Sequence, residues 1–191
     1  SQWGAEPDQT AWNAEAMAKT LTALQPDVVF ALLGTTKARA RLVARAGGDP
    51  ESQSYQRVDV NLTVMLLEAS IAAGSRPRFV YLSSLGVHAA APGPYLQARW
   101  KAEEHIRATD LPWTIARPSF ISGPGRDEAR MGERVGAVLT DGMLAVAGVF
   151  GARRTRDRLG SMNNAELAAG LVRYALDPDG EGRIVDAADL R

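Results

Sequence analysis

The strongest constraint on the fold is a series of strand-length apolar segments that alternate with helix-like segments. These segments are VVFALLG at 28–34, RFVYLSS at 78–84 and WTIARP at 113–118. The first is an unbroken run of β-branched and aliphatic residues, which is typical of strands covered on both faces in a parallel sheet. Strands that alternate with helices predict βαβ units with right-handed crossovers. We therefore expect an α/β fold with a doubly wound, mostly parallel sheet.

The segments between and after these strands carry helical patterns. In residues 8–24, one face of the predicted helix holds Trp12, Ala16, Ala18, Leu21 and Leu24. Residues 55–74 predict a second helix that stops at Gly74, a C-cap residue, and residues 95–108 predict a third. The basic segment 37–46 is compatible with a short helix or a loop. Further helices are expected at 129–144 and 163–176, the latter capped by Asn163 or Asn164, with a last strand at 182–187.

Bulk composition excludes several classes of function. A chain of 191 residues with 46% hydrophobic residues can bury one core, so we expect a single domain over 1–191. The 22 acidic and 22 basic residues balance, which argues against nucleic acid or an anionic membrane as a partner. There is no cysteine, and His88 and His105 lack metal-ligand spacing, so no metal is expected. Neither a membrane-length apolar run nor a signal pattern is present, which indicates a cytoplasmic protein.

Residues that suit carbonyl chemistry follow the second apolar strand. Ser83 and Ser84 end that strand, and ligands of open α/β sheets bind outside the carboxyl ends of the strands. Tyr95 opens the next helix and shares a face with Arg99 at i+4, whereas Lys101 at i+6 is turned away. In this interpretation Ser84 polarises a carbonyl, Tyr95 donates a proton with Arg99 as its cation, and a nicotinamide supplies hydride.

Each of these residue types also has a structural interpretation. Tyr95 is compatible with an aromatic residue packed at the start of a helix, and the two serines with local hydrogen bonds at a strand end. The separated cations Lys37, Arg39, Arg41 and Arg45 are typical of a solvated face, so we leave them out of the predicted site.

Five segments in order resemble the atypical short-chain dehydrogenase/reductases, with the closest likeness to Tat-interacting-protein-like and NmrA-like NAD(P)-binding oxidoreductases. They are LGTT (33–36), VDVNLT (58–63), FVYLSSLGV (79–87), PYLQAR (94–99) and WTIARPSFISG (113–123). The resemblance covers residues 20 to 125 well and the tail from 160 more loosely. It implies a Rossmann-type sheet, an NAD(P) cofactor and a small-molecule substrate, with residues 125–191 on the substrate side.

The resemblance also implies roles for individual residues. Ser84, Tyr95 and Arg99 would hold the catalytic positions, and Tyr95 and Arg99 would also contact the cofactor. The loop after the first strand would line the cofactor with Leu33, Gly34, Thr35 and Thr36. The segment after the third strand would meet the nicotinamide end with Pro118, Ser119, Phe120 and Ile121. The choice between NAD and NADP depends on residues after a strand that this sequence does not display.

Two departures from the family pattern shape the expectations. Arg99 stands where the family has lysine, and the two are not interchangeable. No glycine-rich turn of the dinucleotide-binding type precedes Val28, so we expect the N-terminal glycine-rich βαβ portion, about 60 residues at ~30 per unit, to be missing. Strand 28–33 would then be a hydrophobic edge, open to a homodimer or to pairing with another segment. The alternative function is a catalytically silent regulatory or protein-interaction module.

Overall fold

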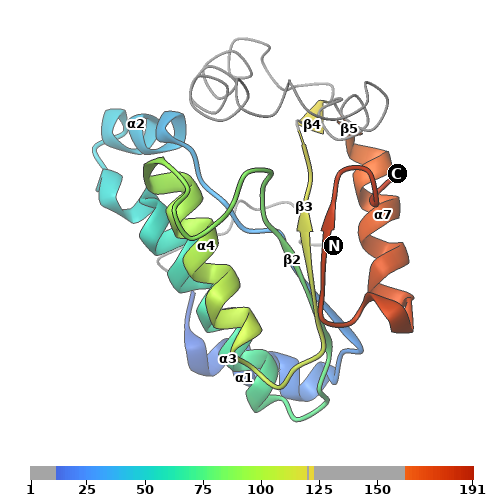
Figure 1. The fold of residues 1–191 in the computed structure, drawn as a ribbon. Coiled ribbons are helices and arrows are strands. Elements are labelled where there is room, and N and C mark those ends of the chain that lie inside the picture. The colour runs from blue at the N-terminus through green and yellow to red at the C-terminus, as the bar shows by residue number, and fades with distance from the viewer. Residues whose placement is uncertain (1–11, 120, 123–161) are drawn as a thin grey trace, which may run out of the picture.

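The structure is a computed structural model that describes residues 12–119, 121–122 and 162–191 (Figure 1). Its centre is a four-stranded parallel sheet in the order β1-β2-β3-β6. The strands are β1 (Val28–Ala31), β2 (Arg78–Leu82), β3 (Trp113–Arg117) and β6 (Arg183–Asp186). A second, two-stranded parallel sheet joins β4 (Ile121–Ser122) to β5 (Met162–Asn163). The predicted parallel α/β fold is confirmed, whereas the helix expected at 129–144 lies outside the described residues.

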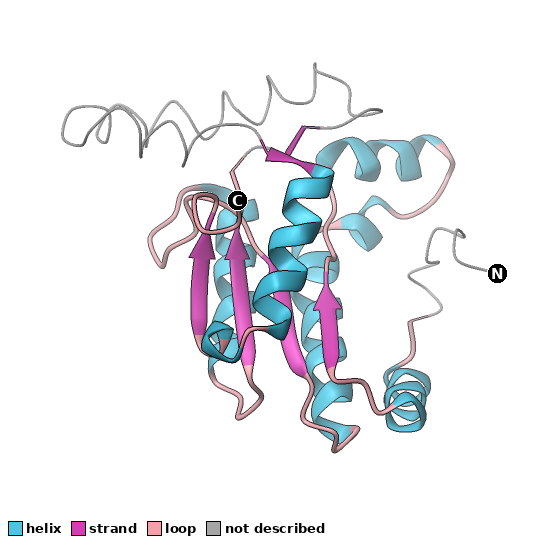
Figure 2. Cartoon of the chain, turned by 90° about the vertical axis from the view of Figure 1, so that its right-hand side faces the viewer, coloured by secondary structure: helices cyan, strands magenta, loops and turns pink. Residues whose placement is uncertain are grey.

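Helices lie on both faces of the sheet, so the doubly wound arrangement is also confirmed. On one face are α3 (Leu62–Ala72) and α4 (Gly93–Arg107), with α1 (Ala14–Leu24) packed beside α3 (Figure 1). On the other face is α7 (Asn164–Leu176), which crosses in front of the strands in Figure 2. No helix in the described ranges has the length and apolarity needed to cross a membrane.

The strands bury alternate residues in two separate core layers. Phe79, Tyr81 and Ile115 pack against Leu67 of α3 and against Ala102 and Ile106 of α4. Val80, Ala116 and Val185 pack on the opposite face against Leu167, Leu171 and Ala175 of α7. Because both faces of β2 and β3 are covered, both sets of side chains are apolar, as the unalternating sequence pattern predicts.

Strand β1 differs from the expectation in its burial. Val29 and Ala31 are buried, but Phe30 is 38% exposed and Leu32, just after the strand, is 53% exposed. The expectation that this run is covered on both faces is wrong, because α7 packs over β2 and β3 and leaves this side of β1 open. Among the described residues β1 is an end strand of its sheet, so the predicted hydrophobic edge is present.

Capping side chains explain where the helices begin. Helix α1 starts at Ala14 because the Asn13 side chain accepts the backbone N–H of Ala16. Its predicted apolar face is only partly right, since Leu21 packs on the core while Leu24 is 68% exposed. The basic segment is a helix, α2 (Lys37–Arg45), with Thr36 as its cap. Helix α7 begins with the predicted Asn163 cap, which forms a capping box with Glu166.

The helix expected over 55–74 is divided into two parts. A 3-10 turn, η2 (Pro50–Gln53), and a π-helical segment, η3 (Gln56–Asn61), precede the regular helix α3. Single π-helical turns occur often at functional sites because they change the direction of side chains within a helix. Here the segment holds Asp59, which is fully buried. The chain leaves α3 through Gly74, whose φ of +77° suits the predicted glycine stop. A 3-10 turn, η4 (Pro178–Gly180), joins α7 to β6.

Candidate active site

The predicted site residues gather at the edge of the sheet where the parallel strands end. Residues 33–36 follow β1, Ser83 and Ser84 follow β2, and Pro118 and Ser119 follow β3. Helix α4 begins at the same edge and carries Tyr95 and Arg99 (Figure 1). Phe120 lies outside the described residues. The carboxyl edge is where open α/β sheets bind ligands, so the topology brings the predicted residues to one place.

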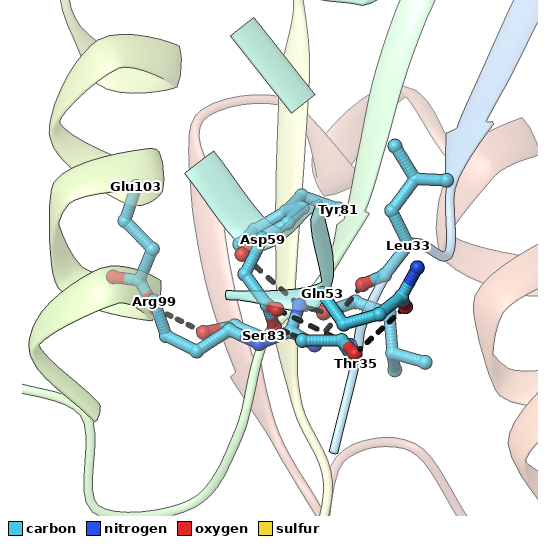
Figure 3. A network of polar contacts seen from close by, with 9 residues as sticks. Leu33, Thr35, Gln53, Asp59, Tyr81, Ser83, Arg99 and Glu103 are labelled. Carbon is cyan, nitrogen blue, oxygen red and sulfur yellow. Dashed lines mark hydrogen bonds and ion pairs between the residues drawn. The ribbon is translucent and has the colours of Figure 1, made fainter. Parts of the chain in front are cut away.

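Arg99 forms the centre of a buried polar network (Figure 3). Its Nη1 donates to the Leu82 carbonyl at 2.7 Å and to the Tyr81 hydroxyl at 3.0 Å. Its Nη2 donates to the Leu33 carbonyl at 3.0 Å and lies 2.9 Å from Oδ1 of Asp59. The guanidinium therefore ties the ends of β1 and β2 to α4 and to the π-helical segment.

The charge of Arg99 is retained despite burial. Burial by itself lowers the pKa of the guanidinium, but Tyr81, Tyr95 and Asp59 together outweigh it and raise that pKa above its ordinary value. Burial raises the pKa of Tyr81 from 10.0 to about 12, against the opposing effect of Arg99. Tyr81 is therefore a neutral phenol that accepts a hydrogen bond, not a base. The Nε of Arg99 is buried and has no hydrogen-bond partner among the described residues.

The loop after β1 is held by side chains that the sequence analysis did not select. The backbone N–H of Thr35 donates to Oδ2 of Asp59 at 3.2 Å, and the Thr35 hydroxyl donates to Oε1 of Gln53 at 3.3 Å. Thr36 caps α2 through the N–H of Arg39. The side chains of both threonines are thus engaged within the protein, and their predicted contacts with the cofactor stay predictions.

Gly34 is required by the position of Arg99. A Cβ atom at residue 34 would lie 2.5 Å from Nη2 of Arg99 and 3.6 Å from Oδ1 of Asp59. Because the guanidinium is fixed by the carbonyls and the carboxylate around it, it has little room to withdraw. The glycine of the LGTT segment therefore makes space for a buried ion pair and leaves its own backbone exposed.

Tyr95 lies beside Arg99, as the helical spacing predicts. The Arg99 guanidinium carbon is 5.4 Å from the centroid of the half-buried Tyr95 ring, whereas Lys101 is exposed. The ring of Tyr55 also packs against Tyr95, with the two centroids 5.4 Å apart. The positional prediction that Arg99, and not Lys101, accompanies Tyr95 is confirmed. Its catalytic role stays a prediction.

The two adjacent serines differ in their surroundings. The Ser83 hydroxyl is buried and donates to Oε1 of Glu103 at 2.6 Å. Ser84 is half-buried, and its hydroxyl has no hydrogen-bond partner in the part of the chain that the structure describes. Of the two, Ser84 has the hydroxyl that remains available for a ligand.

The segment after β3 lies at the same edge of the sheet, where its contacts are with other parts of the protein. Pro118 is buried, and its carbonyl accepts the N–H of Leu85 at 3.0 Å. Ser119 is half-buried, and Ile121 pairs with Met162 and packs on the core layer under α7. These positions leave the predicted contacts with a nicotinamide as predictions.

Sequence reasoning missed three buried polar residues of the site, namely Gln53, Asp59 and Glu103. A signal existed for Glu103, because Tyr95, Arg99 and Glu103 stand at i, i+4 and i+8 on one helical face. A weaker signal existed for Asp59, which interrupts an apolar segment at helical spacing from Thr63. Nothing local marks Gln53, which comes to the site through the turn η2.

The chemistry of these residues fits the nicotinamide and ribose portion of a dinucleotide. The edge offers the half-buried phenol of Tyr95 and the hydroxyl of Ser84, which has no hydrogen-bond partner among the described residues, above the buried guanidinium of Arg99. Hydroxyl and N–H donors of this kind match the hydroxyls and the amide of such a ligand. The glycine-rich turn that meets the pyrophosphate in Rossmann folds is not found in the sequence before Val28.

Comparisons with known proteins agree with this architecture. Residues 8–172 match the model of an NAD(P)H-binding family. No curated protein matches the sequence. Among solved structures, the chain is similar to Pal from Bacillus thuringiensis, with 15% identity and a TM-score of 0.58 over 91% of this chain and 58% of that one.

Two further structures are described as having bound NAD. One is the Bordetella bronchiseptica enzyme WbmG, with 14% identity and a TM-score of 0.52 over 91% of this chain and 55% of that one. The other is a short-chain dehydrogenase/reductase superfamily protein from Agrobacterium tumefaciens, with 20% identity and a TM-score of 0.56 over 92% and 66%. This chain therefore spans between about half and two thirds of the length of these three structures.

The family match and the parallel sheet confirm the predicted fold and, at the level of the family, the predicted cofactor. The chain belongs to the NAD(P)H-binding family, whose cofactor is a nicotinamide dinucleotide, and it has a Rossmann-type fold similar to that of the short-chain dehydrogenase/reductase superfamily protein from Agrobacterium tumefaciens.

Proposed function

We propose that this protein is an NAD(P)(H)-dependent oxidoreductase that interconverts a small carbonyl compound and the corresponding alcohol. Ser84 and Tyr95 act on the carbonyl oxygen, and Arg99 supports Tyr95. Residues 33–36 and the segment Pro118, Ser119, Phe120 and Ile121 face the cofactor, and residues 125–191 contribute the substrate side. The proposal keeps the cytoplasmic location expected from the sequence.

The observation that carries the proposal is the difference between the two serines, together with the position of Tyr95. Ser83 is engaged by Glu103, whereas the hydroxyl of Ser84, at the carboxyl edge of a parallel sheet, has no hydrogen-bond partner among the residues that the structure describes. Tyr95 lies in the first turn of the adjacent helix α4, with the guanidinium carbon of Arg99 5.4 Å from the centroid of its ring. An available hydroxyl and a phenol with a cation beside it are the groups that carbonyl reduction requires.

In the direction of reduction, Ser84 donates a hydrogen bond to the carbonyl oxygen and draws electron density away from the carbon. When bound, the nicotinamide supplies a hydride to that carbon. The electron pair of the C=O π bond moves to the oxygen, which takes the proton of Tyr95 and becomes a hydroxyl. Tyr95 is left as a phenolate and recovers a proton from water. Oxidation is the reverse of these steps.

Arg99 supports Tyr95 through its charge. Its four terminal N–H positions face the Tyr81 hydroxyl, the Asp59 carboxylate and two backbone carbonyls. The guanidinium carbon nevertheless lies 5.4 Å from the Tyr95 ring, where a fixed positive charge favours the phenolate. The family resemblance implies a contact between Arg99 and the ribose hydroxyls. Such a contact would use Nε, or an N–H group that also bonds to one of the four partners named above.

The test is turnover of small aldehydes, ketones and quinones, followed by the absorbance of the reduced nicotinamide with NADH and with NADPH. We expect Tyr95→Phe and Ser84→Ala each to lower kcat by about a hundredfold, a larger effect than on cofactor affinity, because each loses a group that acts in the transition state. The matched control is Tyr174→Phe on α7, where the same hydroxyl is removed away from the carboxyl edge. Equal turnover by all three variants and the wild type would rule the mechanism out.

A second candidate function is protein–protein contact through the edge of β1. Phe30 and Leu32 are exposed beside backbone groups of a strand that is at the end of its sheet in the described residues. Such an edge can pair with another chain, including a second copy of this one. In a light-scattering measurement of molar mass, Leu32→Lys would convert a dimer to a monomer. Leu176→Lys, at an exposed leucine on α7, is the control that leaves the dimer intact.

A further inference from the structure

Glu103 is a fully buried carboxylate that the proposed reaction does not use. It lies on α4, four residues after Arg99 and eight after Tyr95, so all three residues share one face of the helix. A buried carboxylate is unfavourable unless cations and hydrogen bonds compensate its charge. The cations and hydrogen bonds around Glu103 therefore indicate its role.

The charge of Glu103 is compensated by a two-point contact with an arginine at the end of β3. Arg117 donates from Nε to Oε1 at 3.0 Å and from Nη2 to Oε2 at 2.5 Å. Arg107, one turn further along α4, places Nη1 3.7 Å from Oε2. With its charge balanced in this way, the carboxylate still accepts the hydroxyl of Ser83 at 2.6 Å.

The segment that contains Ser84 is fixed on both sides. Before it, the N–H of Ser83 donates to the Ala116 carbonyl at 2.7 Å, and after it, the N–H of Leu85 donates to the Pro118 carbonyl at 3.0 Å. These bonds attach the segment to β3. On the side of α4, the helix that carries Tyr95, the Ser83 hydroxyl bonds to Glu103, next to the bond from Arg99 to the Leu82 carbonyl just before the segment (Figure 3).

We infer that Glu103 is a positioning residue of the proposed reaction. Its carboxylate holds the Ser83 hydroxyl, and through it the segment 83–85, against α4, so that Ser84 keeps a fixed place relative to Tyr95. Glu103 also engages the hydroxyl of Ser83, which leaves Ser84 as the serine that meets the carbonyl. This inference rests on the proposed function, because it concerns the geometry of the same two groups.

The consequence of losing this link follows from the sensitivity of proton transfer to position. The carbonyl oxygen must accept a hydrogen bond from Ser84 and a proton from Tyr95 at the same time. A displacement of 1 Å between two such groups can slow a reaction by up to about a hundredfold. A shift of the serine segment that retains its attachment to β3 should have a smaller effect, on the order of tenfold.

The sharpest variant is Ser83→Ala. Replacement of Glu103 itself leaves Arg117 unpaired and endangers folding, whereas Ser83→Ala keeps the Glu103–Arg117 pair and removes the link to the serine segment alone. We expect kcat to fall about tenfold with little change in the affinity for NADH or NADPH, because the variant alters orientation and not binding.

The matched control is Ser70→Ala. Ser70 is also buried, but its hydroxyl donates to the Leu66 carbonyl within α3. Each variant loses one hydrogen bond of a buried serine hydroxyl, so the melting temperature should fall in both, and further in Ser83→Ala because its acceptor is charged. A structural role alone would give them the same kcat, whereas the positioning role lowers kcat in Ser83→Ala only.

A second readout does not depend on turnover. Because the chain has no cysteine, Ser84→Cys introduces a single thiol at the position in question. Its reaction rate with an aromatic disulfide reagent reports how firmly the segment is held. We expect Ser83→Ala in this background to raise that rate by about threefold or more, and Ser70→Ala to leave it unchanged.

The outcomes separate this inference from the proposed function. A lower kcat together with a faster thiol reaction in the Ser83→Ala variants supports the positioning role. If Ser83→Ala changes neither, the positioning role is overturned, while the Tyr95→Phe and Ser84→Ala results still decide the mechanism. If the wild type shows no turnover, the proposed mechanism fails, and the thiol rates alone decide whether Glu103 holds the segment.

Discussion

Replacing Asp59 by asparagine should destabilise the protein more than the same carboxylate-to-amide change at an exposed position. Asp59 is fully buried, and its Oδ1 lies 2.9 Å from Nη2 of Arg99, whose side chain is also buried. Removing one partner of a buried ion pair costs about 3–5 kcal/mol because the other charge is left uncompensated. Asparagine keeps an oxygen for the N–H of Thr35, and Arg99 keeps its bonds to Leu33, Tyr81 and Leu82. We therefore take the lower end, about 3 kcal/mol.

The loss is measured by urea unfolding at neutral pH, and it corresponds to a fall in Tm of about 6–12 °C for a chain of this size. Arg99→Met should lose at least as much, because it also leaves two carbonyls without their donor. The double variant should be less destabilised than the sum of the two by about 2 kcal/mol, since the second change removes a charge that the first has already left unpaired.

The control is Glu68→Gln, which makes the same chemical change at an exposed position of α3 and should alter stability by at most about 0.5 kcal/mol. The reasoning is refuted if Asp59→Asn is as stable as this control. It is refuted equally if the losses from Asp59→Asn and Arg99→Met simply add.

Three further predictions follow from the same network and from the core. Burial raises the pKa of Tyr81 from 10.0 to about 12, so the stability it contributes is full below pH 10 and is lost as the pH rises toward 12. Between pH 9 and 11.5, the free energy of unfolding measured in urea should therefore fall by about 2 kcal/mol more in the wild type than in Tyr81→Phe. Gly34→Ala should cost about 1–3 kcal/mol through its contact with Arg99, measured as a lower Tm. Gly170→Ala should cost more, because the new Cβ would overlap the backbone carbonyl of Leu190, and equal Tm values for the two variants would contradict this.

Much of the fold could be predicted because its strands are short, apolar and separated by helices. The runs at 78–84 and 113–118 became β2 and β3, with both faces buried. The first run was misjudged in its burial, because a residue such as Phe30 looks the same in sequence whether or not a helix covers it. Coverage depends on where α7 packs, and α7 lies more than a hundred residues further along the chain.

The candidate site could be predicted less completely. Helical spacing placed Arg99 beside Tyr95, and the strand pattern placed Ser84 at the carboxyl edge. The partners of these residues were hidden, because Asp59 enters through a π-helical segment that periodicity does not reveal, and Gln53 through a 3-10 turn. The four contacts of the Arg99 guanidinium are a tertiary property, since its partners come from three separate segments of the chain.

The most direct measurement is amide hydrogen exchange of the full chain with and without NADH or NADPH at saturating concentration. A nicotinamide dinucleotide held at the carboxyl edge should slow exchange in residues 33–36, 83–87 and 118–119, and leave α1 unchanged. Unchanged exchange in all of these segments with both nucleotides, or slowing confined to elements away from this edge, is incompatible with the site described above.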